Sequence, residues 1–535
     1  MSKGLFQNLL LIFVIVTVAG CANRGTPSGG EKDTEPPKIL KTVPENFSTN
    51  FNTDEIRIYF DEYIKIKNIQ KQLIISPPMN TQPDITPLGG AGKYIKIKLH
   101  DTLQPNTTYA FNFGESIVDN NEENPYPYYR YVFSTGDYID SLSVSGQVVD
   151  AKERKTDKFV SVMLYEMDST YTDSTVYKKK PKYITNTLDS LTTFKIDNIK
   201  AGKYKLIALK EENSNYTFQQ KTDKIGFYEG VVNAPTDSLF TLKLFKEEPD
   251  FKALRPKQGA GQRIIFGYEG DYKDVKIDLL ADKPEDFETR ITKNPKTDTL
   301  YYWYRPKLEL DSAQFVVRNR TYIDTLDYRF RDLEKDSLEF KPLQSGTIHF
   351  NQDFQVQANI PFTKIDEKQI TILDQDSSNV SFSTALDSLE NIYTFKFDKK
   401  EADRYNIQML PNTFEDFFGN PNDTLNFSLR TNKKSDYGNI RVRLINAKFP
   451  LILQLVDNTG KVMYEKYTTE SSIVDFNDLS PKQYYLRAIF DANGNKKYDP
   501  GSFLMKRQPE RVSYAQDIDP VRANFDFIIN FTLKD

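Results

Sequence analysis

The sequence predicts an all-β fold: a tandem array of about five β-sandwiches behind a flexible N-terminal tether. Short runs rich in Ile, Val, Tyr and Phe alternate apolar with polar residues, as in Tyr94–Leu99 and Tyr393–Phe397. Such alternation is typical of strands with one buried face. The sequence shows no convincing helical periodicity, and 535 residues are too many for one domain.

Residues 1–20 have the features of an export signal. Lys3 supplies a positive start, and Leu9–Val18 form an apolar run that is too short to span a bilayer as a stable anchor. Small residues then precede the only cysteine of the chain, in Val18-Ala19-Gly20-Cys21. This pattern resembles a bacterial lipobox, which implies a covalent lipid on Cys21. Residues 21–36, rich in glycine and proline, form the predicted tether.

An internal repeat determines much of the domain plan. Ile196–Leu209 aligns with Phe476–Ile489 at a constant offset of 280 residues. Tyr204 falls on Tyr484, and the pattern Tyr-x-Leu-x-Ala follows in both copies. Two segments that share such a pattern are expected to form the same supersecondary unit.

The predicted domains follow from the repeat and from the spacing of strands and turns. They are a signal peptide (1–20), a lipidated tether (21–36), a first sandwich (37–136), a second (137–246), a sandwich of unclear type (250–337), a fourth (338–432) and a fifth (433–535). A weaker repeat links the first with the fourth, because each has an Asp and an Asn or Gly turn before its final strand.

Several motifs resemble known families. Phe60-Asp61-Glu62, Leu103–Tyr109 and Phe133-Ser134-Thr135 resemble the SbsA-type bacterial Ig-like domain, which implies that fold for residues 37–136 and, through the repeat, for 338–432. Residues 137–246 and 433–535 resemble carboxypeptidase-regulatory-like, transthyretin-like β-sandwiches. The whole order, including the tether motif Gly25–Asp33, is similar to multi-domain outer-membrane lipoproteins of Bacteroidota. The resemblance implies no reaction.

One loop is a candidate calcium site. Asp491, Asn493, Asn495 and Asp499 place oxygen side chains at alternate positions, and Gly494 permits a tight turn. Such a loop can wrap a hard cation, here a structural calcium ion. The alternative is a turn held by Asx hydrogen bonds.

A second pattern concerns modification. Asp followed by Ser or Thr and then Leu, Ala or Thr resembles the O-glycosylation acceptor of exported Bacteroidota proteins, and Asp-Ser and Asp-Thr also start turns. The candidate acceptors are Ser141, Ser190, Ser238, Thr299, Thr325, Ser337, Ser388 and Thr424.

Composition limits the functional classes. The 71 basic and 75 acidic residues nearly balance, which argues against binding nucleic acid by bulk charge. With two histidines, His100 and His349, and one cysteine, multi-His and thiolate metal centres are nearly all excluded. The sequence also lacks a P-loop, a GxSxG elbow and an HExxH motif, so we expect no enzyme.

We therefore expect a non-enzymatic outer-membrane lipoprotein that serves as a scaffold or accessory subunit of a β-barrel assembly, secretion or uptake complex. Its expected partners are an integral β-barrel protein and other lipoproteins. A cell-surface adhesin or glycan-binding protein that uses Tyr126–Tyr129 is the alternative, and a hydrolase with an unrecognised carboxylate pair is a third. We expect exposure on the cell surface, with the periplasmic face as the other possibility.

Overall fold

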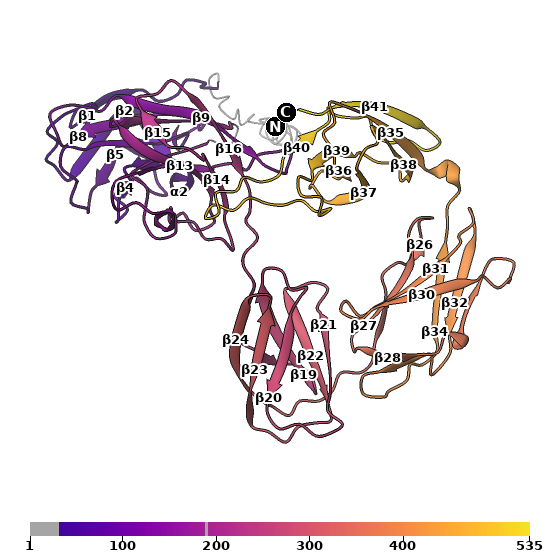
Figure 1. The fold of residues 1–535 in the computed structure, drawn as a ribbon. Coiled ribbons are helices and arrows are strands. Elements are labelled where there is room, and N and C mark those ends of the chain that lie inside the picture. The colour runs from indigo at the N-terminus through magenta and orange to yellow at the C-terminus, as the bar shows by residue number, and fades with distance from the viewer. Residues whose placement is uncertain (1–31, 188–190, 535) are drawn as a thin grey trace, which may run out of the picture. The chain divides into compact units, whose positions relative to one another are not determined.

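The computed structural model describes residues 32–187 and 191–534 (Figure 1). The predicted signal peptide, Cys21 and Ser190 therefore lie outside the described residues. The chain divides into two compact units. Unit 1 comprises Met1–Ser143, Lys182–Thr185 and Ile196–Ala201, and unit 2 comprises Val144–Pro181, Asn186–Lys195 and Gly202–Asp535. Both units consist of strands and short turns, so the all-β prediction is confirmed.

Unit 1 contains a sandwich of two antiparallel sheets. One sheet has the order β1-β2-β5-β4 with β7 on β2, and the other has the order β3-β6-β8. Alternation places Ile95 and Ile97 of β5 in the core, where both are fully buried. The elements are β1 (Ile39–Val43), β2 (Glu55–Ile66), the one-turn helix α2 (Ile69–Gln72), β3 (Ile74–Ser76), β4 (Asp84–Thr86), β5 (Gly92–Lys98), β6 (Thr108–Asn112), β7 (Ile117–Asp119) and β8 (Arg130–Ser134).

The next segment, which we call the second module (residues 137–246), falls largely in unit 2. Its strands β10, β13 and β14 are antiparallel neighbours, and its first strand, β9, pairs in parallel with its last, β16. The elements are β9 (Leu142–Asp150), β10 (Ser161–Glu166), η1 (Asp173–Tyr177), β11 (Tyr183–Asn186), β12 (Thr193–Ile199), β13 (Gly202–Lys210), β14 (Lys224–Phe227), β15 (Val232–Ala234) and β16 (Leu239–Leu244).

Residues 250–337, whose type the sequence left unclear, form two facing sheets. Their orders are β17-β19-β22-β21, with β18 on β19, and β20-β23-β24. The elements are β17 (Lys252–Ala253), β18 (Lys257–Gln258), β19 (Arg263–Glu269), β20 (Lys276–Leu280), β21 (Glu288–Lys293), β22 (Thr299–Arg305), β23 (Ser312–Asn319) and β24 (Tyr322–Arg329).

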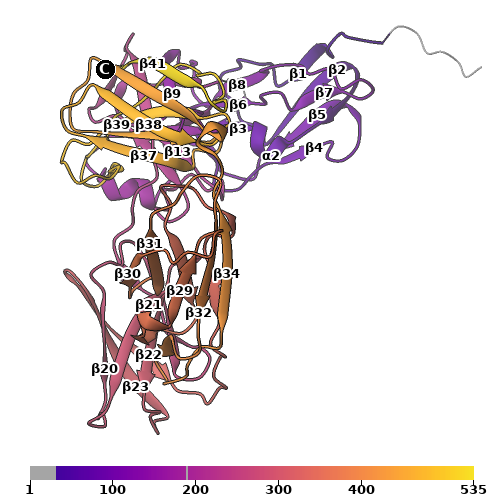
Figure 2. The same ribbon diagram turned by 90° about the vertical axis from the view of Figure 1, so that its right-hand side faces the viewer.

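Residues 338–432 also form a sandwich, with sheet orders β25-β27-β31-β30 and β26-β34-β32-β29 and the pair β28-β33. Figure 2 shows β34, β32 and β29 side by side. The elements are β25 (Phe340–Pro342), β26 (Gly346–Thr347), β27 (Phe354–Ala358), β28 (Phe362–Ile365), η2 (Glu367–Gln369), β29 (Ile370–Leu373), β30 (Phe382–Asp387), β31 (Ile392–Phe397), β32 (Arg404–Met409), β33 (Phe414–Asp416) and β34 (Leu425–Arg430).

The final segment, which we call the last module (residues 433–535), has sheet orders β38-β35-β41 and β37-β36-β39-β40. Its first strand again pairs in parallel with its closing strand. The elements are η3 (Lys434–Asp436), β35 (Gly438–Ile445), β36 (Leu451–Val456), β37 (Val462–Thr468), β38 (Ile473–Leu479), β39 (Tyr485–Phe490), β40 (Val512–Tyr514) and β41 (Asp526–Thr532).

The second and last modules therefore share strand pairings, as their sequence repeat predicts. β10, β13 and β14 correspond to β36, β39 and β40. Tyr204 and Tyr484, which the alignment equates, are each about 1% exposed in their own cores. The alternation of apolar and polar residues in the repeat thus buries equivalent positions in both modules.

Candidate functional site

The loop after β39 holds all four predicted calcium ligands. The Asp491 side chain is fully buried. Its Oδ1 accepts the main-chain N–H of Asn495 at 3.1 Å and its Oδ2 accepts that of Lys496 at 2.9 Å. Asp499 Oδ2 accepts the side-chain amide of Asn495 at 2.8 Å and also that of Asn493. The four side chains converge on one turn that hydrogen bonds hold.

Glu510 joins this loop from farther along the chain, and the sequence pattern did not include it. Its Oε1 accepts the N–H of Ala492 at 2.8 Å and its Oε2 accepts that of Asp499 at 3.0 Å. Burial raises the pKa of Glu510; the two N–H donors lower it, and the carboxylates of Asp499 and Asp491 raise it again. A divalent cation at this place would relieve that repulsion.

This donor set fits calcium in composition. Carboxylates and amide oxygens are the ligands that calcium takes. Over residues 32–187 and 191–534, however, no three His, Cys, Asp or Glu side chains are grouped to hold a metal ion. The carboxylates alone are therefore too few, and Asn493 and Asn495 would have to supply further oxygen ligands. At present their side-chain nitrogens face Asp499, so a calcium site requires both amide groups to rotate until their oxygens face it. The calcium site stays a prediction.

Calcium binding has a direct test in the variant Asp499→Asn, which removes one carboxylate but keeps an oxygen. We expect wild-type protein to unfold at a higher temperature in calcium than in chelator, because a ligand in hundredfold excess over its dissociation constant stabilises by about 2.7 kcal/mol. The variant should lose this difference. Asp457→Asn is the matched control, since Asp457 Oδ1 accepts the N–H of Thr459 at 2.9 Å in another turn of the same module. Equal unfolding of the wild type in calcium and in chelator would exclude the metal.

The same connection carries a projecting loop. The Glu510 N–H donates to the Asp499 main-chain oxygen at 3.0 Å, and Ser502 and Arg507 exchange main-chain hydrogen bonds of 2.8 and 2.9 Å. These bonds close the base of a hairpin-like segment whose tip includes Phe503. Residues 491–499 and Glu510 thus fix the orientation of the tip. We call residues 499–510 the docking loop.

The tip of the docking loop enters the second module. Phe503 is 1% exposed, and its ring lies edge-on to Phe227 with centroids 5.3 Å apart. The Phe503 N–H donates to the carboxylate of Glu247, the residue that directly follows the second module, and the other oxygen of this carboxylate accepts the Gln220 amide at 2.9 Å. Gln508 donates to the Phe227 oxygen at 3.0 Å. Because Glu247 is only 4% exposed, burial raises its pKa, while the two donors oppose the rise.

A second contact between these modules is built around a buried cation. Arg487 of β39 is fully buried. Its Nε donates to Gln454 at 2.8 Å, and its Nη1 donates to the Tyr514 hydroxyl at 3.1 Å and to the Lys152 main-chain oxygen at 3.2 Å. Nη1 also lies 3.4 Å from the Glu153 carboxylate. The guanidinium therefore joins two strands of the last module to the second module.

Two further features add to the contact between these modules: a close approach of the two chains at Gly460 and an exposed ion pair of Arg154. Gly460 has a positive φ of 83°, and a side chain there would collide with Glu153. Arg154 forms an ion pair with Asp517 and lies over the Tyr485 ring at 4.4 Å. The second and last modules thus meet through the docking loop and through Arg487. We call this the module contact.

Neither Arg487 nor Phe503 belongs to a predicted site, but the sequence repeat contains a signal for the arginine. At the offset of 280 residues Arg487 falls on Ile207, which is fully buried in the second module. A charged residue at the position of a core isoleucine indicates that this strand face has a polar partner. Phe503 has no equivalent signal, since its loop is specific to the last module.

The described glycosylation candidates lie at the surface. Thr299, at the start of β22, is half-buried. The others are exposed: Ser141, Ser238, Thr325, Ser337, Ser388 and Thr424. Such exposure is what an attached sugar requires, and glycosylation itself stays a prediction.

The Tyr126–Tyr129 loop differs from the exposed cluster expected. Tyr126 and Tyr129 pack against the core of the first sandwich, and their rings meet edge-on at 5.8 Å. Tyr128 alone of the three is exposed, at 45%, and its hydroxyl donates to Glu115 at 3.1 Å. The aromatic surface offered to a glycan is therefore smaller than the sequence suggested.

The two histidines and the tryptophan have structural contacts. His100 and His349 lie just after β5 and β26, not within strands. His100 Nε2 lies 2.9 Å from Asp84, and His349 contacts the main-chain oxygen of Asp478. Trp303 is 2% exposed and donates from its indole nitrogen to Thr292 at 2.9 Å.

Comparison with known families covers the first sandwich. Residues 33–135 match the family described as Bacterial Ig-like domain, so the chain is an all-β multidomain protein with a bacterial Ig-like domain. No curated protein matches the chain significantly. Within the described ranges no helix is long and apolar enough to cross a membrane.

Among solved structures, domains 1–6 of the surface layer protein SbsC are 10% identical, with 91% of this chain and 67% of that chain covered and a TM-score of 0.16. The TIE protein of Bacillus anthracis is 11% identical, with 95% and 76% covered and a TM-score of 0.14. The BSP domain of a biofilm associated protein is 8% identical, with 88% and 96% covered and a TM-score of 0.15. Scores this low carry no argument about function.

Proposed function

We propose that this chain is a non-enzymatic, lipid-anchored scaffold of the bacterial outer membrane, which holds β-sandwich modules for an integral β-barrel protein or other lipoproteins. The module contact carries this proposal. A buried arginine and a buried aromatic ring are used to fix one module against another. Two modules that are fixed relative to each other lose less conformational freedom when a partner binds to both. This lower entropic cost of binding favours a scaffold.

The anchor and the membrane rest on the N-terminal motif. Cys21 follows two small residues after a short apolar run, and Ala22 follows it. The lipid supplies outer-membrane attachment, and the exposed glycosylation candidates support a cell-surface position in a Bacteroidota-type envelope. A bacterial Ig-like domain at residues 33–135 is compatible with such an extracytoplasmic position.

Purification from native membranes after in-cell cross-linking tests the scaffold. We expect a stoichiometric β-barrel partner to be recovered with the wild-type chain. Cys21→Ser is the control, because it removes the lipid and leaves residues 32–534 unchanged. Recovery of the wild-type chain without a partner would contradict the scaffold, and specific retention on a glycan array would instead favour an adhesin.

Protease treatment of whole cells tests the location. If the chain is anchored on the outer face, added protease should remove it while a periplasmic marker protein remains intact. Permeabilised cells are the control, in which both proteins should be degraded. Full protection of the chain in intact cells would place it on the periplasmic face.

A further inference from the structure

The closing strand of the last module has a free edge. β41 pairs with β35 on one side and has no other strand neighbour in the described part of the chain. Asn439 N–H donates to the Phe525 oxygen at 3.0 Å, and Leu533 N–H donates to the Ile445 oxygen at 3.0 Å. In a parallel ladder alternate residues bond the neighbouring strand. The main-chain groups of Ile528 and Asn530 therefore point away from β35.

In the second module β16 is also an edge strand, but the chain just after it is bonded to the other sheet. There the closing strand is continued by Phe245, which exchanges two main-chain hydrogen bonds of 2.8 Å with Ile225 of β14. In the last module the corresponding connection is a single bond of 3.1 Å, from the Lys534 N–H to the Ser513 hydroxyl. The edge of β41 before Lys534 is thus left open.

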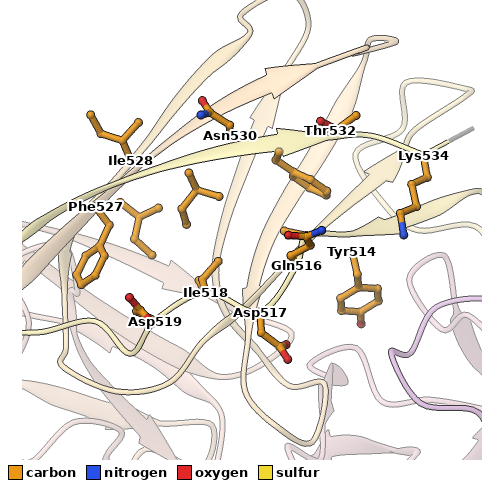
Figure 3. A pocket seen from close by; sticks show the side chains of 14 residues that line it. Tyr514, Gln516, Asp517, Ile518, Asp519, Phe527, Ile528, Asn530, Thr532 and Lys534 are labelled. Atoms are coloured by element: carbon orange, nitrogen blue, oxygen red, sulfur yellow. The ribbon is translucent and has the colours of Figure 1, made fainter.

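A groove runs beside this edge. It has a volume of about 500 Å³ and lies between β41 and the segment that follows β40 (Figure 3). Ile518 comes from that segment, and Phe527 and Ile529 come from β41. Both β41 residues are half-buried, whereas Phe240 of β16, which corresponds to Ile529 by strand pairing, is 8% exposed. The last module therefore leaves apolar surface beside unpaired main-chain groups.

The pattern of side chains along β41 is complementary to itself. The residues whose main chain faces the free edge are Asp526, Ile528, Asn530 and Thr532, and Lys534 continues the series. If a second β41 runs antiparallel with Asn530 opposite Asn530, each Asp526 faces a Lys534 of the other copy. Ile528, which is 59% exposed, then faces Thr532. Opposite charges across two strands stabilise the pairing.

We propose that two copies of this chain associate through β41, antiparallel and centred on Asn530, so that two sheets become one. In this register the free main-chain groups of Ile528, Asn530 and Thr532 become paired in both copies. Phe527 and Ile529 of the second copy project to the same side as their counterparts and cover the open groove. The interface therefore provides hydrogen-bond partners for main-chain groups of β41, buries the apolar groove and places Asp526 of each copy opposite Lys534 of the other.

Analytical ultracentrifugation of the purified full chain tests this pairing. Wild-type protein should dimerise reversibly. Asp526→Lys and Lys534→Asp should each weaken dimerisation about tenfold, because each places like charges opposite one another twice. The double variant with both changes should recover the wild-type dissociation constant. Lys466→Asp, on the edge strand β37, is the matched control and should change nothing.

A backbone variant distinguishes the pairing from a charge effect. Asn530→Pro removes an N–H that points to the free edge, so the ladder with β35 stays intact and the unfolding temperature should change little. We expect this variant to be monomeric. Wild-type chain that stays monomeric at every concentration overturns the proposal and leaves the edge for a strand of another protein. A double charge variant no better than the single ones overturns the register.

Discussion

Phe503→Ala is expected to separate the second and last modules. The ring is buried against Phe227 and Tyr177 of the second module. Loss of a buried phenylalanine costs about 3–5 kcal/mol, since the cavity adds to the lost transfer energy. The docking loop should then exchange its amide hydrogens faster, as should β14. Segment-resolved hydrogen exchange, together with denaturant unfolding, measures both effects.

The neighbouring residue supplies the control for this change. Leu504 is 56% exposed in the same loop, so Leu504→Ala removes a side chain of similar size from the surface. We expect it to change the free energy of unfolding by about 0.5 kcal/mol or less. Equal effects of Phe503→Ala and Leu504→Ala would contradict the docking of the loop.

Arg487→Ile is expected to weaken the module contact without changing the docking loop. The second module already has isoleucine at the equivalent position, so the last module should keep its own core. The change leaves the Lys152 oxygen, the Tyr514 hydroxyl and Gln454 without their cationic donor. Breaking such a buried network costs about 3 kcal/mol. Denaturant unfolding measures this loss.

An exposed arginine in the same module is the reference. Arg441 donates to both oxygens of Asp475 at 2.8 Å, but its side chain is 53% exposed. Exposed ion pairs contribute less than about 1 kcal/mol, because water competes for both partners. Arg441→Ile should therefore cost much less than Arg487→Ile. A similar loss of unfolding free energy in the two variants would contradict the claim that Arg487 stabilises the protein because its side chain is buried.

The strands could be predicted because they depend on local patterns. Tyr94–Leu99 alternates, and the structure places Ile95 and Ile97 in the core of β5. The repeat around Tyr204 and Tyr484 likewise predicted the shared pairing of the second and last modules. The alternation of apolar and polar residues along a strand is a local property, so it can be recognised without knowing which distant residues pack against the strand.

The module contact could not be predicted in the same way. Arg487 and Glu153 are far apart in the sequence, and which strand faces meet depends on the packing of whole modules. Glu510 was missed for a related reason, since it returns to the Asp491 loop only after the docking loop. The Tyr126–Tyr129 loop was misjudged because composition does not reveal that Tyr126 and Tyr129 fold back onto the core.

The distance between the second and last modules tests the scaffold most directly. Lys158 and Lys461 are exposed, one on each module, and can be changed to cysteine and spin-labelled in a Cys21→Ser background of the full chain. We predict a single narrow distance distribution from electron–electron double resonance, which broadens in Phe503→Ala and in Arg487→Ile. A broad distribution in the unaltered module contact would contradict a fixed scaffold.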